Sequence, residues 1–439
     1  MRRVTAQIPV LIAILTISWP GLGVAQDTPS DSIFVVERGA PGVDAWDVAE
    51  FPFKIATAPL YLLALGLGRA AGAADDIHLI EWVTYYNQRL NANYLYPGAG
   101  SLGSGSGFGA ALLLGVPDDD RLVWGYVRGD VTYKQYWGVV ARIGYGMEEF
   151  VPGDPRRFGI HAFGSIIHRD RDEFFGIGKE SREQDKSDFE LDRQAVGVEL
   201  GLAPIRTIAI RVGLDWSTVE SGPGNNPRLP DLDSIFDPAA VSRFGDEDRY
   251  LGIGVAGEWR SGYDRPLLGA GRWLRVGFRW NDSRSTGAAD FTELEASAGV
   301  DLPFDYDRRS LALGVLFRSV RASGDGELPF YRLPALGGSS TAPAYLTSRF
   351  RDRDLILGRS EYFYRLWALS DEGMALIASV FLDGGMVAWD LIDDFAFKHL
   401  KPSYGIALSA LAGAYGGGRI ELAGGDEGFR VNLGFAMGQ

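Results

Sequence analysis

The chain has 439 residues, a formal net charge of −14, 58 glycines and no cysteine. Without cysteine there can be no disulfide, thiolate zinc site or iron–sulfur cluster, and the acidic pI of 4.9 argues against a nucleic-acid partner. A mean hydropathy of −0.03 is too polar for a bundle of membrane helices, which need ~20 apolar residues each. It does fit a membrane β-barrel, whose strands turn one face to a polar interior.

The N-terminus has the pattern of a secretory signal peptide. Residues 2 and 3 are arginine, Ile8–Trp19 is uncharged, and the small residues Gly23-Val24-Ala25 follow. A membrane anchor is the alternative, but ~12 apolar residues span only about 18 Å of helix, short of a ~30 Å hydrocarbon core. We therefore predict a signal peptide over 1–25 and export from the cytoplasm.

A second apolar stretch, Ile55–Gly68, lies between Lys54 and Arg69. It is too short for a comfortable membrane span, so we expect a short helix that packs on a larger body. We assign it to an N-terminal periplasmic segment over residues 26–82.

From about residue 104 onward, apolar and polar residues alternate in segments separated by turn residues. Strict alternation gives each strand one apolar and one polar or small face. In the segment 206–216 the apolar face holds Ile208, Ile210, Val212, Leu214 and Trp216. The predicted strands lie near 104–115, 122–134, 137–148, 157–169, 189–202, 206–218, 248–260, 272–284, 290–302, 309–320, 354–367, 374–383, 402–413, 416–424 and 428–437.

A water-soluble β-sandwich also alternates, so the composition of the two faces has to decide. The apolar rows often end in an aromatic residue, such as Trp216, Trp259, Trp280 and Phe317. Such rows are typical of the aromatic girdles of membrane barrels. The opposite face carries glycine with isolated Arg, Glu and Asp, which suits a polar lumen. We favour an outer-membrane barrel over a soluble sandwich.

The positions of the long loops determine the number of strands. The segments 170–188, 219–247 and 321–353 should all be extracellular, because periplasmic turns are short. This requires one further strand before residue 170, and 84–96 is the candidate; Ala203-Pro204 then becomes a tight periplasmic turn. The predicted fold is all-β: a 16-stranded antiparallel transmembrane β-barrel over 83–439, preceded by the short helical segment.

Several stretches resemble one known family, the bacterial surface antigen barrel of the BamA/TamA superfamily. They are Leu328–Thr341 (LPFYRLPALGGSST), Arg349–Arg353, Phe381–Gly385 and Phe174–Gly178. The resemblance implies a 16-stranded barrel whose relatives insert or secrete other proteins at the outer membrane, usually with N-terminal POTRA domains. No repeated βααβ-like pattern precedes the strands, so we expect no complete POTRA domain.

The resemblance also implies a long loop that folds back into the lumen. In the family, an Arg-Gly-Tyr or Arg-Gly-Phe tip on this loop pairs its Arg with an Asp on a neighbouring strand. Aligned on Gly337 and Gly338, the tip here ends in Tyr345 and has lost the Arg, while the apparent partner Asp383 remains.

An unpaired carboxylate in a narrow lumen would be costly. We therefore expect the missing guanidinium to be replaced by Arg349, Arg351 or Arg353. The alternative is that Asp383 faces lumen water. On the preceding strand Arg359, Glu361 and Arg365 share one face, as loop contacts or as a solvated lumen surface.

The resemblance implies that the protein assists insertion or translocation of protein or lipid at the outer membrane of a Gram-negative-type cell. A passive pore or structural barrel is the alternative, and an outer-membrane hydrolase is less favoured. Expected partners are outer-membrane lipid and a periplasmic protein or client outer-membrane protein.

No enzyme motif stands out in the sequence. There is no His-Glu-x-x-His or Gly-x-Ser-x-Gly motif. His161 and Ser165 share a strand face but lie about 13 Å apart, too far for a dyad. The charged segment 169–192 lacks EF-hand spacing. We expect no catalytic residue, no cofactor and no metal.

Overall fold

The computed structural model describes most of the chain from Leu95 onward. The described residues are 95–100, 109–116, 122–132, 136–237, 241–262, 270–305, 308–324, 326–369, 374–412 and 416–437. The predicted signal peptide (1–25) and the N-terminal segment with its apolar helix (26–82) lie outside these residues.

One large antiparallel sheet dominates the described chain. Its order is β1-β2-β3-β4-β5-β6-β7-β8-β9-β10-β11-β14-β15-β16-β17-β18, so each strand pairs with its neighbours along the chain apart from the short β12 and β13. The all-β prediction is confirmed at this level. The strands are β1 (Leu95–Gly100), β2 (Gly109–Val116), β3 (Val123–Thr132), β4 (Trp137–Gly146), β5 (Phe158–Phe174), β6 (Ser187–Ile205), β7 (Ile208–Pro223), β8 (Glu247–Ser261), β9 (Gly271–Ser283), β10 (Asp290–Asp305), β11 (Arg309–Ser323), β14 (Asp354–Leu369), β15 (Met374–Ala388), β16 (Lys401–Ala412), β17 (Gly416–Gly425) and β18 (Gly428–Met437).

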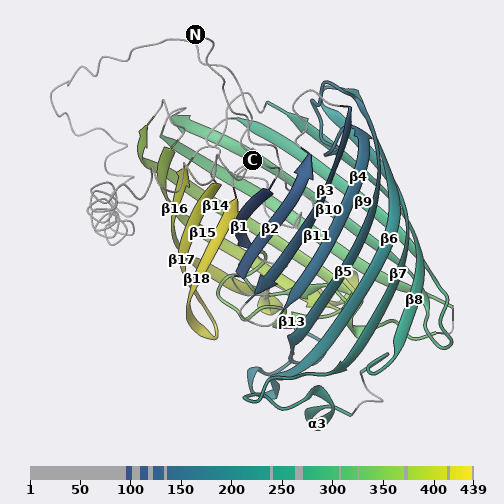
Figure 1. Ribbon diagram of the computed structural model, residues 1–439. Helices are drawn as coiled ribbons and strands as arrows, with labels where there is room; N and C mark the ends of the chain where they lie inside the picture. The colour runs from purple at the N-terminus through teal and green to yellow at the C-terminus, as the bar shows by residue number, and fades with distance from the viewer. Residues whose placement is uncertain are drawn as a thin grey trace, which may run out of the picture.

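The sheet curls so that its first and last strands come together. Dark-blue β1 lies beside yellow β18 in Figure 1, and the two strands are in contact. Within the described residues no hydrogen-bonded ladder joins them, whereas all the other neighbours in the sheet are paired. We refer to the two surfaces of the curled sheet as its inner and outer faces.

The outer face carries the apolar residues of the alternation. On β9, Leu274, Val276 and Phe278 are 45%, 42% and 45% exposed, although they are large and apolar. Arg275 and Arg279, which alternate with them, point to the inner face and form ion pairs there. The alternation predicted from the sequence is therefore observed, with the apolar residues turned outward.

The inner face is held by cross-strand ion pairs. Examples are Arg279 Nη2 to Asp215 Oδ1 at 2.6 Å, Arg275 Nη2 to Glu258 Oε2 at 2.8 Å and Arg318 Nε to Glu295 Oε2 at 2.9 Å. Arg275 and Arg318 face their partners across a ladder, whereas Arg279 on β9 reaches past β8 to Asp215 on β7. Such pairs neutralise charges that would otherwise be costly to partly bury.

The long loops all lie at one end of the sheet, as the parity of the strands requires. They are 175–186, 224–246, 324–353 and 389–400. The last was not predicted as a long loop, and β5, β6 and β7 run several residues into segments predicted as loop. The predicted turn at Ala203-Pro204 is wrong: both residues belong to β6, beside a register irregularity between Leu202 and Ile205, and β7 begins at Ile208.

Within the described residues, helical structure is limited to short turns in the loops. These are η2 (Glu183–Asp185), α3 (Leu232–Ile235), η4 (Phe330–Arg332), α4 (Leu391–Asp394) and η5 (Phe397–His399). In the described part of the chain, no helix has the length and hydropathy needed to cross a bilayer.

At the opposite end, the turn between β4 and β5 folds under the inner face. Phe150 stacks on His161, with ring centroids 4.9 Å apart. A Cβ atom on Gly201 would lie 1.9 Å from Cδ1 of Phe150, so only glycine leaves room for this ring. His161 is itself buried and lies 2.6 Å from Glu199 Oε2 on β6.

Candidate functional site

The loop between β11 and β14, residues 324–353, packs against the inner face of the sheet; we call it the inner loop. Its two arms form a short hairpin, in which β12 (Ala335–Leu336) pairs with β13 (Phe350–Arg351). Leu336 and Phe350 are buried in one cluster with Leu355 on β14 and Phe381 on β15. Burying each such side chain contributes about 1.5–3 kcal/mol, so the loop has an apolar anchor.

Two consecutive glycines turn the inner loop just before its tip. Gly337 and Gly338 have φ angles of 122° and 87°, which L side chains rarely adopt. A Cβ atom on Gly337 would also lie 2.1 Å from the carbonyl oxygen of Leu346. The Thr341 hydroxyl closes the turn, since it accepts from Gly337 N at 2.9 Å and donates to Gly337 O at 3.0 Å.

The tip, Pro343–Tyr345, is hydrogen-bonded to the last strands of the sheet. Ala344 N donates to Ser403 Oγ on β16 at 3.0 Å, and Arg430 Nε on β18 donates to Ala344 O at 3.1 Å. Asn432 Nδ2, also on β18, donates to Pro343 O at 3.0 Å. The alternation had put Arg430 and Asn432 on the polar face of their strand, but no local pattern indicated this contact.

The side chain of Tyr345 is buried beneath the tip. It is 1% exposed, and its ring packs on Phe350 with centroids 5.4 Å apart. Its hydroxyl oxygen accepts from Asp426 N at 3.4 Å, and burial raises the pKa of Tyr345 to about 12. The tyrosine is therefore a neutral packing residue at physiological pH.

Asp383 pairs with Arg359, not with any of the three arginines expected from the sequence. The two residues face each other across β14 and β15, with Nε–Oδ1 and Nη2–Oδ2 distances of 3.2 Å. Arg359 Nη1 also donates to Ser340 O at 2.9 Å. Since the Asp383 side chain is 2% exposed, the alternative of a carboxylate in open lumen water is wrong as well.

The three arginines each have a different environment. Arg349 Nε donates to Glu427 Oε1 at 2.8 Å, and its guanidinium lies over the ring of Phe350. Arg351 Nη1 donates to the carbonyl oxygen of Phe330 at 3.2 Å. Arg353 stacks over Trp389 at 3.4 Å from the ring centroid. Burial raises the pKa of Glu427, against the lowering effect of Arg349.

Glu361 lies on the inner face but its polar contacts are with the sheet. Its Oε1 accepts from Ser379 Oγ at 2.6 Å and from Arg419 Nη1 at 2.7 Å, and Arg419 also pairs with Glu421. Within the described residues these contacts make Glu361 part of the wall beneath the inner loop, and the expected direct contact with the loop is not among them.

Sequence stretches that are far apart meet at the inner loop. Phe174 of the stretch 174–178 packs edge-on against Phe330, with centroids 5.3 Å apart. Gly178 N donates to Arg351 O at 2.7 Å. The stretch 381–385 supplies Asp383 and a buried Phe381. The stretches singled out in the sequence therefore form one cluster.

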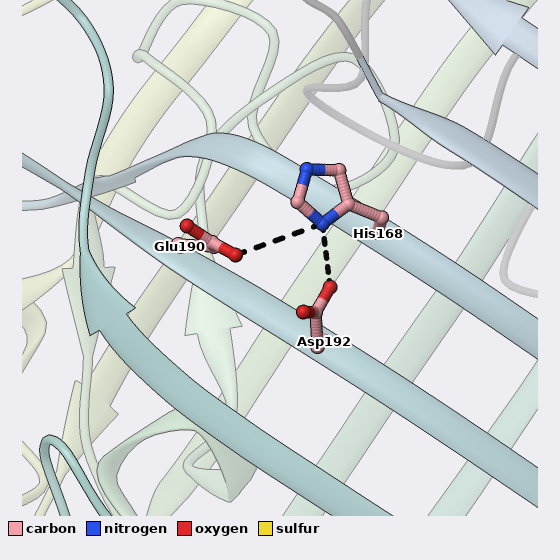
Figure 2. A group of neighbouring side chains, drawn as sticks. All are labelled: His168, Glu190 and Asp192. Carbon is pink, nitrogen blue, oxygen red and sulfur yellow. Dashed lines mark hydrogen bonds and ion pairs between the residues drawn. The ribbon is translucent and has the colours of Figure 1, made fainter.

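A second cluster lies on the outer face near the long-loop end and is drawn in Figure 2. His168 on β5 points toward Glu190 and Asp192 on β6, with Nδ1 2.6 Å from Asp192 Oδ1 and 3.7 Å from Glu190 Oε1. Its ligand atoms are close enough to hold a cation. No sequence motif indicates this group, because only the register that aligns His168 with Asp192 brings it together. The short contact to Asp192 accounts for its geometry without an ion.

Comparison with known proteins gives structural matches. No protein-family model matches the chain, and no curated protein sequence matches it. BamA from Haemophilus ducreyi lacking POTRA domains 1–3 superposes with a TM-score of 0.55 at 12% identity, over 78% of this chain and 69% of that one. The fold of the chain is therefore similar to that of BamA. CdiB from Escherichia coli superposes with a TM-score of 0.51 at 12% identity, over 78% of this chain and 62% of CdiB.

The inner loop contacts the sheet at two places. Its tip bonds to β18, one of the two strands that meet without a ladder in the described residues, and Ser340, just before the tip, accepts a hydrogen bond from Arg359 on β14. Within the described residues, these contacts tie the inner loop to β18, beside the place where the two terminal strands meet.

Proposed function

We propose that this protein is an outer-membrane β-barrel that assists the insertion or translocation of protein or lipid. In this proposal the sheet closes as a 16-stranded barrel after signal-peptide export, with the long loops outside the cell. The expected partners are outer-membrane lipid, a client outer-membrane protein and a periplasmic protein that delivers the client. The role is not enzymatic.

The outer face supports a lipid environment. Large apolar side chains are exposed on strand after strand, among them Val196, Val212, Val255 and Leu313. A water-soluble protein rarely exposes a contiguous apolar patch of more than a few hundred Å². Trp216 and Trp259 lie on the same face, 40% and 37% exposed, as aromatic girdles require.

The meeting of β1 and β18 is the observation that carries the proposed role. A membrane barrel has to satisfy its backbone groups by closing its ladder, yet these strands touch without one in the described residues. Two residues of β18, Arg430 and Asn432, hold the tip of the inner loop. Movement of this loop would therefore be coupled to the strand at which a client could enter.

A disulfide lock tests this role cleanly, because the chain has no native cysteine. One cysteine is placed in β1 and one in β18, and the protein is reconstituted in liposomes with an unfolded outer-membrane barrel as client. We expect the reduced protein to accelerate client folding and the oxidised protein to lose that acceleration. The matched control is a cysteine pair at Val255 and Phe278, which face each other across β8 and β9; its oxidation should leave the acceleration intact.

The alternatives give different results in the same liposomes. A passive pore would show steady ion conductance that the β1–β18 lock does not change, and no acceleration of client folding in either redox state. A hydrolase would release fatty acid from the phospholipid when calcium is added, and either outcome would contradict the proposal.

A further inference from the structure

Arg351, a buried arginine of the inner loop, has no ion pair among the residues that the structure describes. The Arg351 side chain is 8% exposed, and its guanidinium donates to one acceptor, the carbonyl oxygen of Phe330 at 3.2 Å. Its Nε is buried without a hydrogen-bond partner. Among the described residues no carboxylate forms an ion pair with it. A buried charge of this kind is costly unless something compensates it.

Arg351 lines a cavity between the inner loop and the wall formed by β5 and β6. The cavity has a volume of about 80 Å³ and is also lined by Tyr136, Arg169, Asp172, Thr347 and Ser348. This is room for roughly two or three water-sized groups. Thr347 and Ser348 line the same space as Arg351.

The carboxylates around the cavity already have cations. Asp172 Oδ2 accepts from Arg169 at 3.4 Å and its Oδ1 accepts from the Tyr136 hydroxyl at 2.8 Å. Glu173 Oε1 lies 3.1 Å from Lys186 Nζ. Each of these carboxylates thus has a cation other than Arg351, and neither forms an ion pair with Arg351 within the described residues. Burial lowers the pKa of Arg351 to about 10, which still leaves it charged at neutral pH.

We propose that this cavity binds a small inorganic anion, of chloride size, against the Arg351 guanidinium. The anion would accept a hydrogen bond from the unsatisfied Nε of Arg351 and neutralise its guanidinium. It would also bridge the inner loop, which supplies Arg351, Thr347 and Ser348, to the wall, which supplies Arg169. Anion binding therefore stabilises the loop in its docked position.

Thermal unfolding in two salts tests the site. The purified protein is heated in detergent in sodium chloride or in sodium gluconate, whose anion is too large for the cavity, at one ionic strength. We expect the unfolding midpoint to rise by several degrees with chloride and to saturate. Arg351→Met should abolish the rise without lowering the midpoint in gluconate, because it removes a charge that has no partner there. Arg353→Met is the matched control, since Arg353 stacks on Trp389 away from the cavity, and should keep the chloride response.

Asp172→Asn separates the anion from an internal ion pair. If an anion neutralises Arg351, this change removes a repelling charge and should tighten chloride binding several-fold. If Asp172 is the counterion of Arg351 instead, Asp172→Asn will lower the midpoint equally in both salts and the proposal is wrong. Should Arg351→Met fail to fold, broadening of the chloride NMR line by the wild-type protein decides, and the absence of saturable broadening overturns the proposal.

Discussion

Arg430 on the last strand donates a hydrogen bond to the carbonyl oxygen of Ala344 at the tip of the inner loop, with Nε and O 3.1 Å apart. The neighbouring inner-face residue of that strand, Asn432, bonds to Pro343. These contacts make β18 both a wall strand and the support of the loop.

Replacing Arg430 should therefore loosen the tip. We expect Arg430→Met to lower the free energy of unfolding by about 1.5–3 kcal/mol, the range for a hydrogen bond that involves a charged group. A double-mutant cycle with Asn432→Leu should give a coupling energy of at least about 0.5 kcal/mol, because both side chains hold one segment. Arg249→Met, at an exposed surface pair, is the control and should have little effect. Additive losses from Arg430 and Asn432 would contradict a shared tip.

Asp383→Asn should be more damaging, because it leaves Arg359 without its buried partner. Breaking one side of a buried pair costs about 3–5 kcal/mol, which should appear as a lower temperature for the heat-induced gel shift. Arg359→Met combined with Asp383→Leu should recover much of the loss, since it removes both charges. If Asp383→Asn alone behaves as the wild type does, the pair does not hold the wall and the loop together.

Gly337→Ala should displace the inner loop, because its Cβ would collide with the Leu346 carbonyl in a backbone conformation strained for alanine. We expect a larger single-channel conductance in planar bilayers and faster proteolysis within residues 340–349. Gly384→Ala is the matched control: its Cβ would meet nothing within 4 Å. Equal conductance of both variants would argue that the loop does not depend on this turn.

Glu149, in the turn beneath the inner face, should make stability depend on pH. Burial raises its pKa to about 7, against the lowering effects of Arg260 and Arg142. Unfolding then releases a proton between about pH 4.5 and 7, so the free energy of unfolding falls as pH rises through this window. The contribution is on the order of 3 kcal/mol at about 1.4 kcal/mol per pH unit. Urea titrations near pH 5 and pH 8 should show this fall in the wild type and a smaller one in Glu149→Gln. An identical pH dependence in both proteins would exclude the assignment.

The sequence predicted the strands well because alternation is a local signal. Each strand of the large sheet overlaps a predicted segment, and the faces of β9 are as the pattern indicated. The predicted strand ends were wrong where an irregularity in the strand register shifts the alternation of apolar and polar residues. The register irregularity between Arg169 and Asp172 hid the continuation of β5, and the one between Leu202 and Ile205 displaced a predicted turn.

The sequence predicted several residues of the candidate site, but not which of them are in contact. The sequence singled out Asp383 and put Arg359 on a polar face, yet it named arginines of the loop as partners. Which guanidinium meets Asp383 depends on the register of β14 against β15 and on where the loop docks. Both are set by packing between residues far apart in the chain, which no spacing in the sequence encodes.

The turn that carries Phe150 and the inner loop fold over the inner face from opposite ends of the strands. A bacterium that holds the proposed barrel in its outer membrane would thus keep two independent seals between the cell surface and the periplasm. Loss of one seal should leave the cell resistant to bulky antibiotics. Loss of both should make the cell sensitive to these antibiotics. The two segments together would then keep the proposed barrel from forming an open channel across the outer membrane.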